Sequence, residues 1–339
     1  MTMKWLAAGA VALSVGMTAT ASYAQTTTVP GEQVGLAVGA PLPEGVYAIN
    51  TFTYRSPDGP NATSVDTAVN IPVLVWSTPW QILGARVELA IAPPTVFTFS
   101  RAANGRDTSI NVGTFVGGIF AWDLGSNVGV SYLAGVYLND LNAGRGGGLG
   151  ILASNTYRQG FAISYTGDGW NLTANLTYNF YDVPARFEGR GGIPGFYGNQ
   201  FPSDALNLDL TATKKFGKFE IGAIGYGTTN LSNRGPLRFS PANFPAGCLG
   251  QGGICGSVGP SGGGRFALGG LIGYDFGPFT VQAWVARDVV SSTQQISPFT
   301  GLPNGRTAYS TEGWFRIIAP LYTVAAAPPP PPAPLIRKY

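Results

Sequence analysis

The chain contains no histidine among its 339 residues, and only 11% of the residues are charged. Without histidine it lacks the base of Ser–His–Asp hydrolysis and the commonest transition-metal ligand. Its two cysteines have no carboxylate cluster beside them, which argues against a zinc site. A net charge of +3 provides no basic surface for nucleic acid. We therefore expect no enzyme, no metal, no cofactor and no nucleic-acid partner.

Long apolar runs are also missing. Beyond its start, the chain has no stretch of the roughly 20 apolar residues that a membrane-spanning helix needs. At the start, Lys4 precedes a short apolar core, and Ser22-Tyr23-Ala24 places small residues before Gln25. This pattern predicts a cleaved signal peptide at residues 1–24, with an N-terminal membrane helix as the alternative. A mature chain that crosses a membrane must then use strands closed into a barrel, since every backbone group in hydrocarbon needs a partner.

Glycine and aromatic residues are plentiful, and the expected connections between strands alternate strictly in length. The short ones are residues 78–83, 124–127, 166–169, 216–218 and 276–278. The long ones are residues 57–64, 93–107, 142–154, 184–203, 232–264 and 291–308. Six long and five short connections require twelve strands. The sequence thus predicts an all-β, antiparallel, up-and-down transmembrane β-barrel of about 12 strands, with both termini in the periplasm.

The expected strands show a two-residue period. In the clearest one, Trp170, Leu172 and their even-numbered successors alternate with asparagine and threonine. One face therefore suits lipid and the other suits a polar lumen. Pro72 lies inside another expected strand, where it predicts a bulge or a locally unpaired site.

Aromatic residues gather near both ends of the expected strands. Those beside the short turns are Trp76, Trp80, Trp122, Trp170, Phe216, Phe219, Phe276 and Phe279. Those toward the long connections are Tyr54, Tyr137, Tyr157, Tyr181 and Tyr226. Two such groups predict two belts at the membrane interfaces, because tryptophan and tyrosine prefer the headgroup level.

Three segments resemble a known family. They are Leu42-Pro43-Glu44-Gly45-Val46-Tyr47, the hairpin at 218–226 and the closing strand at 313–320. These segments are similar to outer-membrane proteins associated with the meta-pathway of phenol degradation, and the resemblance covers residues 41–321. It implies a transporter for aromatic or other hydrophobic compounds. It supplies no set of substrate-binding residues.

Polar residues on the inward face are the candidate site. The candidates are Arg86, Glu88, Asn175, Asn179, Asp209, Gln282, Glu312 and Arg316. They either line a passage and set its solute preference, or form ion pairs that fill the lumen. Eight-stranded barrels have room only for side chains and barrels of sixteen or more strands hold a channel, so about twelve strands leave both readings open.

The long connections carry two further predictions. Cys248 and Cys255 lie in the longest one and are expected to form a disulfide in an oxidising compartment, with free thiols as the alternative. The arginines in or beside these connections are Arg55, Arg101, Arg106, Arg145, Arg186, Arg190, Arg234, Arg238 and Arg306. They either bind lipopolysaccharide phosphates or are ordinary solvated charges.

Four parts follow from these patterns. Residues 1–24 are the signal peptide, and residues 25–43 form either a periplasmic segment or a partial plug of the lumen. Residues 44–320 form the barrel. Residues 321–339 form a proline-rich periplasmic tail, whose proline run cannot form a strand.

The sequence favours a channel or transporter in the bacterial outer membrane for small hydrophobic or aromatic solutes, with the solute class taken from the resemblance. The alternative is a non-conducting structural barrel that acts through its extracellular loops. The expected partners are membrane lipid including lipopolysaccharide, a small-molecule solute and the barrel-assembly machinery.

Overall fold

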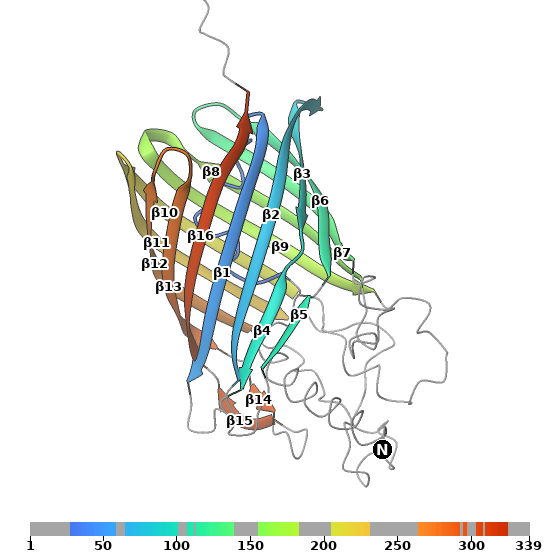
Figure 1. Cartoon of the computed structure of the whole chain (residues 1–339), viewed down its shortest axis with the longest axis vertical. Coiled ribbons are helices and arrows are strands. Elements are labelled where there is room, and N and C mark those ends of the chain that lie inside the picture. Colours follow the sequence, from blue (N-terminus) through green and yellow to red (C-terminus); the bar gives the residue numbers. More distant parts are fainter. Residues whose placement is uncertain are drawn as a thin grey trace, which may run out of the picture.

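The computed structural model describes residues 28–58, 65–100, 107–111, 113–138, 155–182, 205–230, 264–291, 294–296, 303–307 and 309–324. They form one antiparallel sheet of fourteen strands that closes on itself (Figure 1). Two of these strands continue others end to end, so the ring has twelve. In order around the barrel they are β1 (Gly45–Asp58), β2 (Val65–Ile82), β3 (Ala85–Ala92), β6 (Thr114–Asp123), β7 (Val128–Leu138), β8 (Asn155–Tyr165), β9 (Trp170–Asp182), β10 (Ala205–Phe216), β11 (Phe219–Asn230), β12 (Gly264–Asp275), β13 (Thr280–Ser291) and β16 (Tyr309–Thr323).

The ring closes between the first and the last strand. β1 pairs with β16 along its whole length and with β2 on its other side. At the end of β16, the Val324 N–H donates to the Glu44 carbonyl over 3.0 Å. The barrel therefore continues three residues beyond its expected end at Pro320. The predicted class, an antiparallel barrel of twelve strands, is confirmed.

The wall is interrupted beside β2. β4 (Thr95–Ser100) continues β3, and β5 (Thr108–Asn111) continues β6. β2 pairs with β3 through residues 74–77 and 81–82, with an irregularity between them, and with β4 through residues 65–70. The described pairing on this side therefore also skips Pro72 and its two neighbours.

Pro93 and Pro94 separate β3 from β4. Proline has no N–H for a ladder, which explains why prolines on both strands meet at one break. The locally unpaired site predicted at Pro72 is confirmed. The prediction that residues 93–107 form only a loop is wrong, because β4 occupies 95–100.

The short connections all lie at one end of the barrel, the upper end in Figure 1. The first is shorter than expected: β2 runs to Ile82 and pairs with Ala85, so only Leu83 and Gly84 make the turn. Both take positive φ, 51° and 79°, as a tight two-residue hairpin turn requires. The predicted turn at 78–83 is therefore wrong in both bounds, since the turn residues are 83 and 84.

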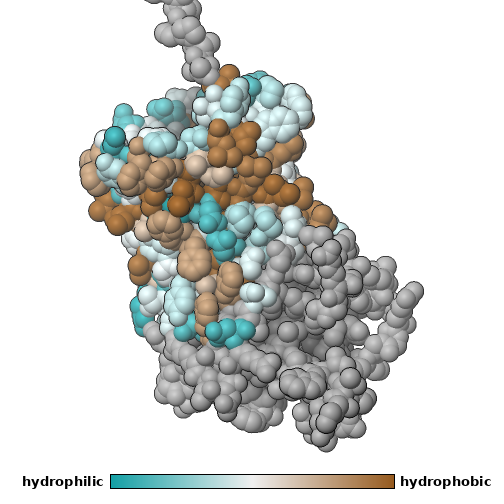
Figure 2. Space-filling view, viewed as in Figure 1, coloured by the Kyte–Doolittle hydropathy of each residue, from teal (hydrophilic) through white to brown (hydrophobic). Residues whose placement is uncertain are grey.

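Apolar side chains cover the outside of the barrel. Figure 2 shows them as a brown band across the described part of one face. Large exposed side chains include Leu74, Phe161, Leu172, Ile221, Ile272, Val285 and Phe315. Seven of the eight predicted short-turn aromatics are exposed as well, namely Trp76, Trp80, Trp170, Phe216, Phe219, Phe276 and Phe279. This outer surface suits contact with hydrocarbon.

The second predicted belt is partly wrong. Tyr54 is exposed, whereas Tyr137 and Tyr226 are 3% and 0% exposed and point into the barrel. Their strands alternate as expected, but these two tyrosines occupy the inward positions.

A separate hairpin, β14 (Gln294–Ile296) and β15 (Pro303–Thr307), lies within the predicted long connection at 291–308. Among the described residues, no helix has the length and apolar character that a membrane-spanning helix needs.

Candidate functional site

The barrel lumen is occupied by residues 28–42, which we call the lumen segment. It enters at the short-turn end, where the Leu42 N–H donates to Glu88 over 2.8 Å and the Ser77 hydroxyl donates to the Leu42 carbonyl over 3.0 Å. Further along, the Gly39 N–H donates to the Ser164 hydroxyl over 2.9 Å. A trace of this segment is visible inside the barrel in Figure 1.

Deeper in the barrel, the wall binds the backbone of the lumen segment. The N–H groups of Gly31 and Gln33 donate to the two carboxylate oxygens of Asp209 over 2.9 and 3.3 Å. The Gly35 N–H donates to the Thr211 hydroxyl over 2.8 Å. Buried N–H groups need such partners, and the inward polar residues of β10 supply them.

Glycine is required at two of these positions. Gly31 and Gly35 take φ of +94° and +83°, a region that other residues rarely adopt. A Cβ on Gly31 would lie 3.0 Å from the Tyr226 ring, and a Cβ on Gly35 would lie 2.8 Å from Leu271. The segment thus turns sharply while its backbone stays against the wall.

Side chains of the lumen segment also bind the wall. Glu32 forms a buried ion pair with Arg158 of β8, and Asn175 donates to the Gln33 side-chain oxygen. The Thr28 hydroxyl donates to Asn179 over 2.6 Å. These contacts reach β8 and β9, so the segment is fixed to more than one part of the wall.

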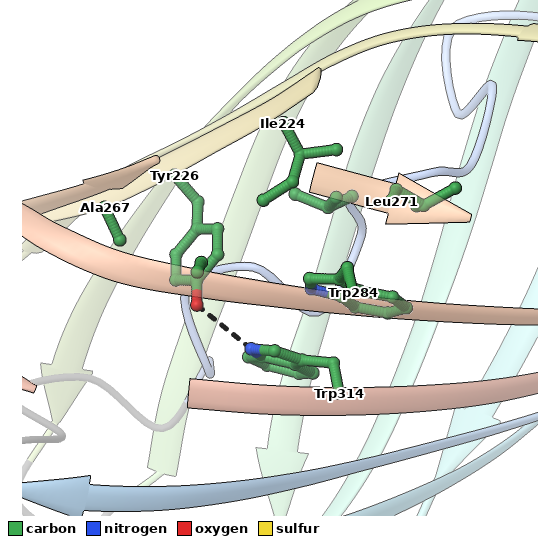
Figure 3. Packing of buried hydrophobic residues seen from close by; sticks show 8 residues of the cluster. Ile224, Tyr226, Ala267, Leu271, Trp284 and Trp314 are labelled. Atoms are coloured by element: carbon green, nitrogen blue, oxygen red, sulfur yellow. Dashed lines mark hydrogen bonds between the residues drawn. The ribbon is translucent and has the colours of Figure 1, made fainter. Parts of the chain in front are cut away.

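Val34 is fully buried in an apolar pocket, which we call the Val34 pocket. The buried residues that form one apolar cluster with it are Ile224, Tyr226, Ala267, Leu271, Trp284, Ala286 and Trp314. In Figure 3 the rings of Trp284 and Trp314 lie one above the other, with centroids 5.2 Å apart and planes at 10°. The Trp314 indole N–H donates to the Tyr226 hydroxyl over 3.0 Å, which fixes the edge of this aromatic group.

Four charged residues nearer the long-loop end form the wall cluster: Arg55, Arg265, Asp288 and Glu312. Each arginine pairs with both acids, at distances from 2.7 to 3.4 Å, and all four are nearly fully buried. Their strands, β1, β16, β13 and β12, are successive neighbours. The ion pairs of the wall cluster therefore form within the barrel wall alone.

Seven of the eight predicted candidates are buried on the inward side: Glu88, Asn175, Asn179, Asp209, Gln282, Glu312 and Arg316. All seven except Glu312 hydrogen-bond to the lumen segment. The eighth, Arg86, is partly exposed and donates to the Thr78 carbonyl over 3.1 Å. Their role in setting solute preference stays a prediction.

Several buried inward residues were not among the predicted candidates: Arg158, Glu220, Arg265, Trp284, Asp288 and Trp314. The signal for them was available, since Trp284 and Asp288 share the face of Gln282, and Trp314 shares the face of Glu312. Arg55 is a correction, because it was placed among the loop arginines and is instead 7% exposed and paired with Asp288 and Glu312.

Other predicted residues lie outside the part of the chain that the structure describes. These include Cys248 and Cys255, residues 1–27 and the tail beyond Val324. The side chains of the remaining loop arginines are not described either. Among the described side chains, no group of three or more His, Cys, Asp or Glu is arranged to hold a metal ion.

Comparison with known proteins gives one match in sequence. A family model described as "Putative MetA-pathway of phenol degradation" matches residues 50–297. No curated protein matches the chain.

Several solved structures have a similar overall course of the chain. They include the NanC porin (9% identity, TM-score 0.40, 79% of this chain and 98% of that one) and a FadL homologue of Pseudomonas aeruginosa (9% identity, TM-score 0.43, 86% and 98%). The beta domain of the Bordetella autotransporter BrkA has 12% identity and a TM-score of 0.40, and the match covers 80% of this chain and 98% of that one. At these values we draw no conclusion from them about this chain.

Proposed function

We propose that this chain, which belongs to the family described as "Putative MetA-pathway of phenol degradation", is an outer-membrane channel. Its solutes are small hydrophobic or aromatic compounds. Residues 1–24 are then a signal peptide that is cleaved on export. The barrel is inserted by the barrel-assembly machinery, with its short turns in the periplasm and its long connections among lipopolysaccharide. It performs no catalysis.

The observation that carries this proposal is the way in which the lumen is filled. In the described structure the lumen segment pairs with no strand and binds the wall through separate hydrogen bonds and one ion pair. Such contacts are exchanged for water when a segment leaves, so each neutral hydrogen bond contributes only about 0.5–1.5 kcal/mol net and each bond to a charged group about 1.5–3 kcal/mol. We therefore infer that the lumen segment closes a passage and leaves it when solute crosses.

The filled lumen also favours a second candidate. If the lumen segment never leaves, the protein is a non-conducting structural barrel that acts through its long connections. The two candidates differ in whether anything crosses the barrel.

Proteoliposomes separate them. Two neutral glucosides that do not cross lipid, phenyl glucoside and methyl glucoside, are compared for entry through the full mature chain and through a variant that lacks residues 25–40. The proposed channel admits phenyl glucoside faster than methyl glucoside, and the deletion raises both rates. Absence of entry with both proteins overturns the channel and favours the structural barrel.

A further inference from the structure

Arg316 has unusual partners for a buried arginine. It is fully buried, yet its guanidinium donates to neutral oxygens: the backbone carbonyls of Glu32 and Val34, the Thr51 hydroxyl and the Gln282 side chain. Among the described residues, no carboxylate forms an ion pair with it. A buried guanidinium ordinarily binds a carboxylate or phosphate bidentately. Two carbonyls of the lumen segment here take the place of such an anion.

The guanidinium lies against the Val34 pocket. Its central carbon is 4.7 Å from the centroid of the Trp284 ring. The Trp284 indole nitrogen is buried and has no hydrogen-bond acceptor. A buried donor without a partner is costly and calls for an explanation. The pocket thus offers an apolar, aromatic volume with two kinds of donor, one charged and one neutral, at its boundary.

The lumen segment fills this site as an internal ligand. The Val34 side chain occupies the aromatic volume, and the carbonyls of Glu32 and Val34 accept from Arg316. The lumen segment does not satisfy every group of the site. The Val34 side chain offers no acceptor to the Trp284 indole N–H, and a neutral carbonyl binds the Arg316 guanidinium less strongly than a carboxylate does.

We propose that the Val34 pocket and Arg316 form a binding site for an aromatic carboxylate, which replaces the lumen segment during transport. The ring takes the place of the Val34 side chain beside Trp284 and Trp314, and the carboxylate takes the place of the two carbonyls on Arg316. The proposal rests on the proposed channel only for the route by which solute reaches the site.

An aromatic group of this kind also attracts organic cations. Here the Arg316 guanidinium already lies over the Trp284 ring, so a second cation is repelled. Neutral aromatics fit the pocket but leave Arg316 without an anion. The geometry therefore favours aromatic anions over aromatic cations and over neutral aromatic compounds.

The acidic groups nearby have their own partners. Glu312 pairs with Arg55 and Arg265, and Glu220 accepts from Thr213 and Gln282. Asp209 is the exception, since its donors are N–H groups of the lumen segment and depart with it. Its negative charge then has no partner and repels an entering carboxylate, so Asp209→Asn is expected to strengthen binding of the carboxylate.

The test is a titration of the purified full mature chain in micelles, followed by tryptophan fluorescence and calorimetry. The probes are benzoate, benzyl alcohol and benzyltrimethylammonium at neutral pH. Benzoate is expected to bind about tenfold more tightly than either of the others, the gain expected from a charge-assisted pair of hydrogen bonds. Equal affinity for benzoate and benzyl alcohol overturns the proposal.

Three variants locate the site. Arg316→Gln is expected to weaken benzoate binding about tenfold. The matched control Arg287→Gln lies on β13 with an exposed side chain and is expected to change nothing. Val34→Ala leaves the barrel wall intact but weakens the internal ligand by two methyl groups, so benzoate binds about tenfold more tightly.

The Val34→Ala gain keeps the test decisive even where Arg316→Gln fails to fold, since a loss of barrel structure never tightens binding. No gain with this variant overturns the proposal. Entry of phenyl glucoside with no benzoate preference refutes the site and leaves the channel standing. Benzoate binding with no entry of either glucoside refutes the channel and leaves the site standing.

Discussion

The wall cluster and the lumen segment contacts are both buried, polar and on the inward side of the barrel, but they depend on different partners. In the wall cluster, Arg55 and Arg265 meet Asp288 and Glu312 within the strands themselves. Arg158 and Arg316, in contrast, reach their partners in the lumen segment. The first set joins strands of the barrel wall to one another, and the second set binds the lumen segment to that wall. Burial alone does not distinguish a structural charge from a functional one.

The largest expected effect is on the wall cluster. Glu312→Ala leaves two buried arginines with Asp288 alone, and removal of one member of a buried ion pair costs about 3–5 kcal/mol. We expect the free energy of unfolding in urea and detergent to fall by that amount. The exposed Arg287→Ala is the control, and a loss no greater than the control's would contradict a structural role for the cluster.

Glu32→Gln is the corresponding change in the lumen segment. It breaks the buried pair with Arg158, but here the segment can leave and water can hydrate Arg158. We expect segment docking to weaken by about 2 kcal/mol, the value of a charged hydrogen bond, with little change in the stability of the barrel. Planar-bilayer recordings should then show more frequent open steps. If Glu32→Gln lowered the free energy of unfolding as much as Glu312→Ala does, the wall cluster and the lumen segment contacts would not differ in their effect on the barrel.

Gly39 tests the fit of the lumen segment. A Cβ there would lie 2.5 Å from the Ser164 backbone nitrogen, which cannot move without breaking the wall. Gly39→Ala is expected to cost the Gly39–Ser164 hydrogen bond, about 1 kcal/mol, and to raise conductance modestly. Gly313→Ala is the control on the wall, since its Cβ meets nothing within 4 Å. Equal conductance of the two variants would count against a docked segment in the membrane.

The smallest effect is expected on the outer surface. The Lys214 ammonium lies 4.8 Å from the centroid of the Trp170 ring, near the short-turn end. Because exposed cation–π contacts contribute about 0.5–1 kcal/mol, Lys214→Ala should change the free energy of unfolding by no more than that and leave conductance unaltered. An altered conductance would show that charge outside the lumen affects the passage.

The ring of strands was predictable because its rules are local. Two-residue alternation assigns Asp209, Gln282 and Arg316 to the inward face, and turn residues give the number of strands. The same rule also covers Trp284 and Trp314, which were not among the candidates because only polar residues of the inward face were chosen. Arg55 was misplaced for a different reason: it stands close to a long connection, and proximity to a loop suggested solvent.

The course of the lumen segment was not predictable. Residues 28–42 have no periodic pattern, and many of their contacts use backbone N–H and carbonyl groups, which every sequence possesses. The glycines at 31 and 35 indicate turns but not the wall that the turns face. Likewise Pro93 and Pro94 indicate a break, whereas the pairing that resumes in β4 depends on β2, its neighbour in the sheet.

The barrel closes only when its last strand, β16, pairs with its first, β1, and this has a consequence for the order of folding. Arg316 and Glu32 are separated by 284 residues along the chain, and Gly31 and Asp209 by 178. Contacts of such long range form late, because closing large loops is entropically costly before the intervening strands are in place. The lumen segment is synthesised before every strand, yet its binding site is incomplete until the last strand has joined the first. We expect the nascent barrel to be open, and docking of its own N-terminal residues to be the final step of its assembly.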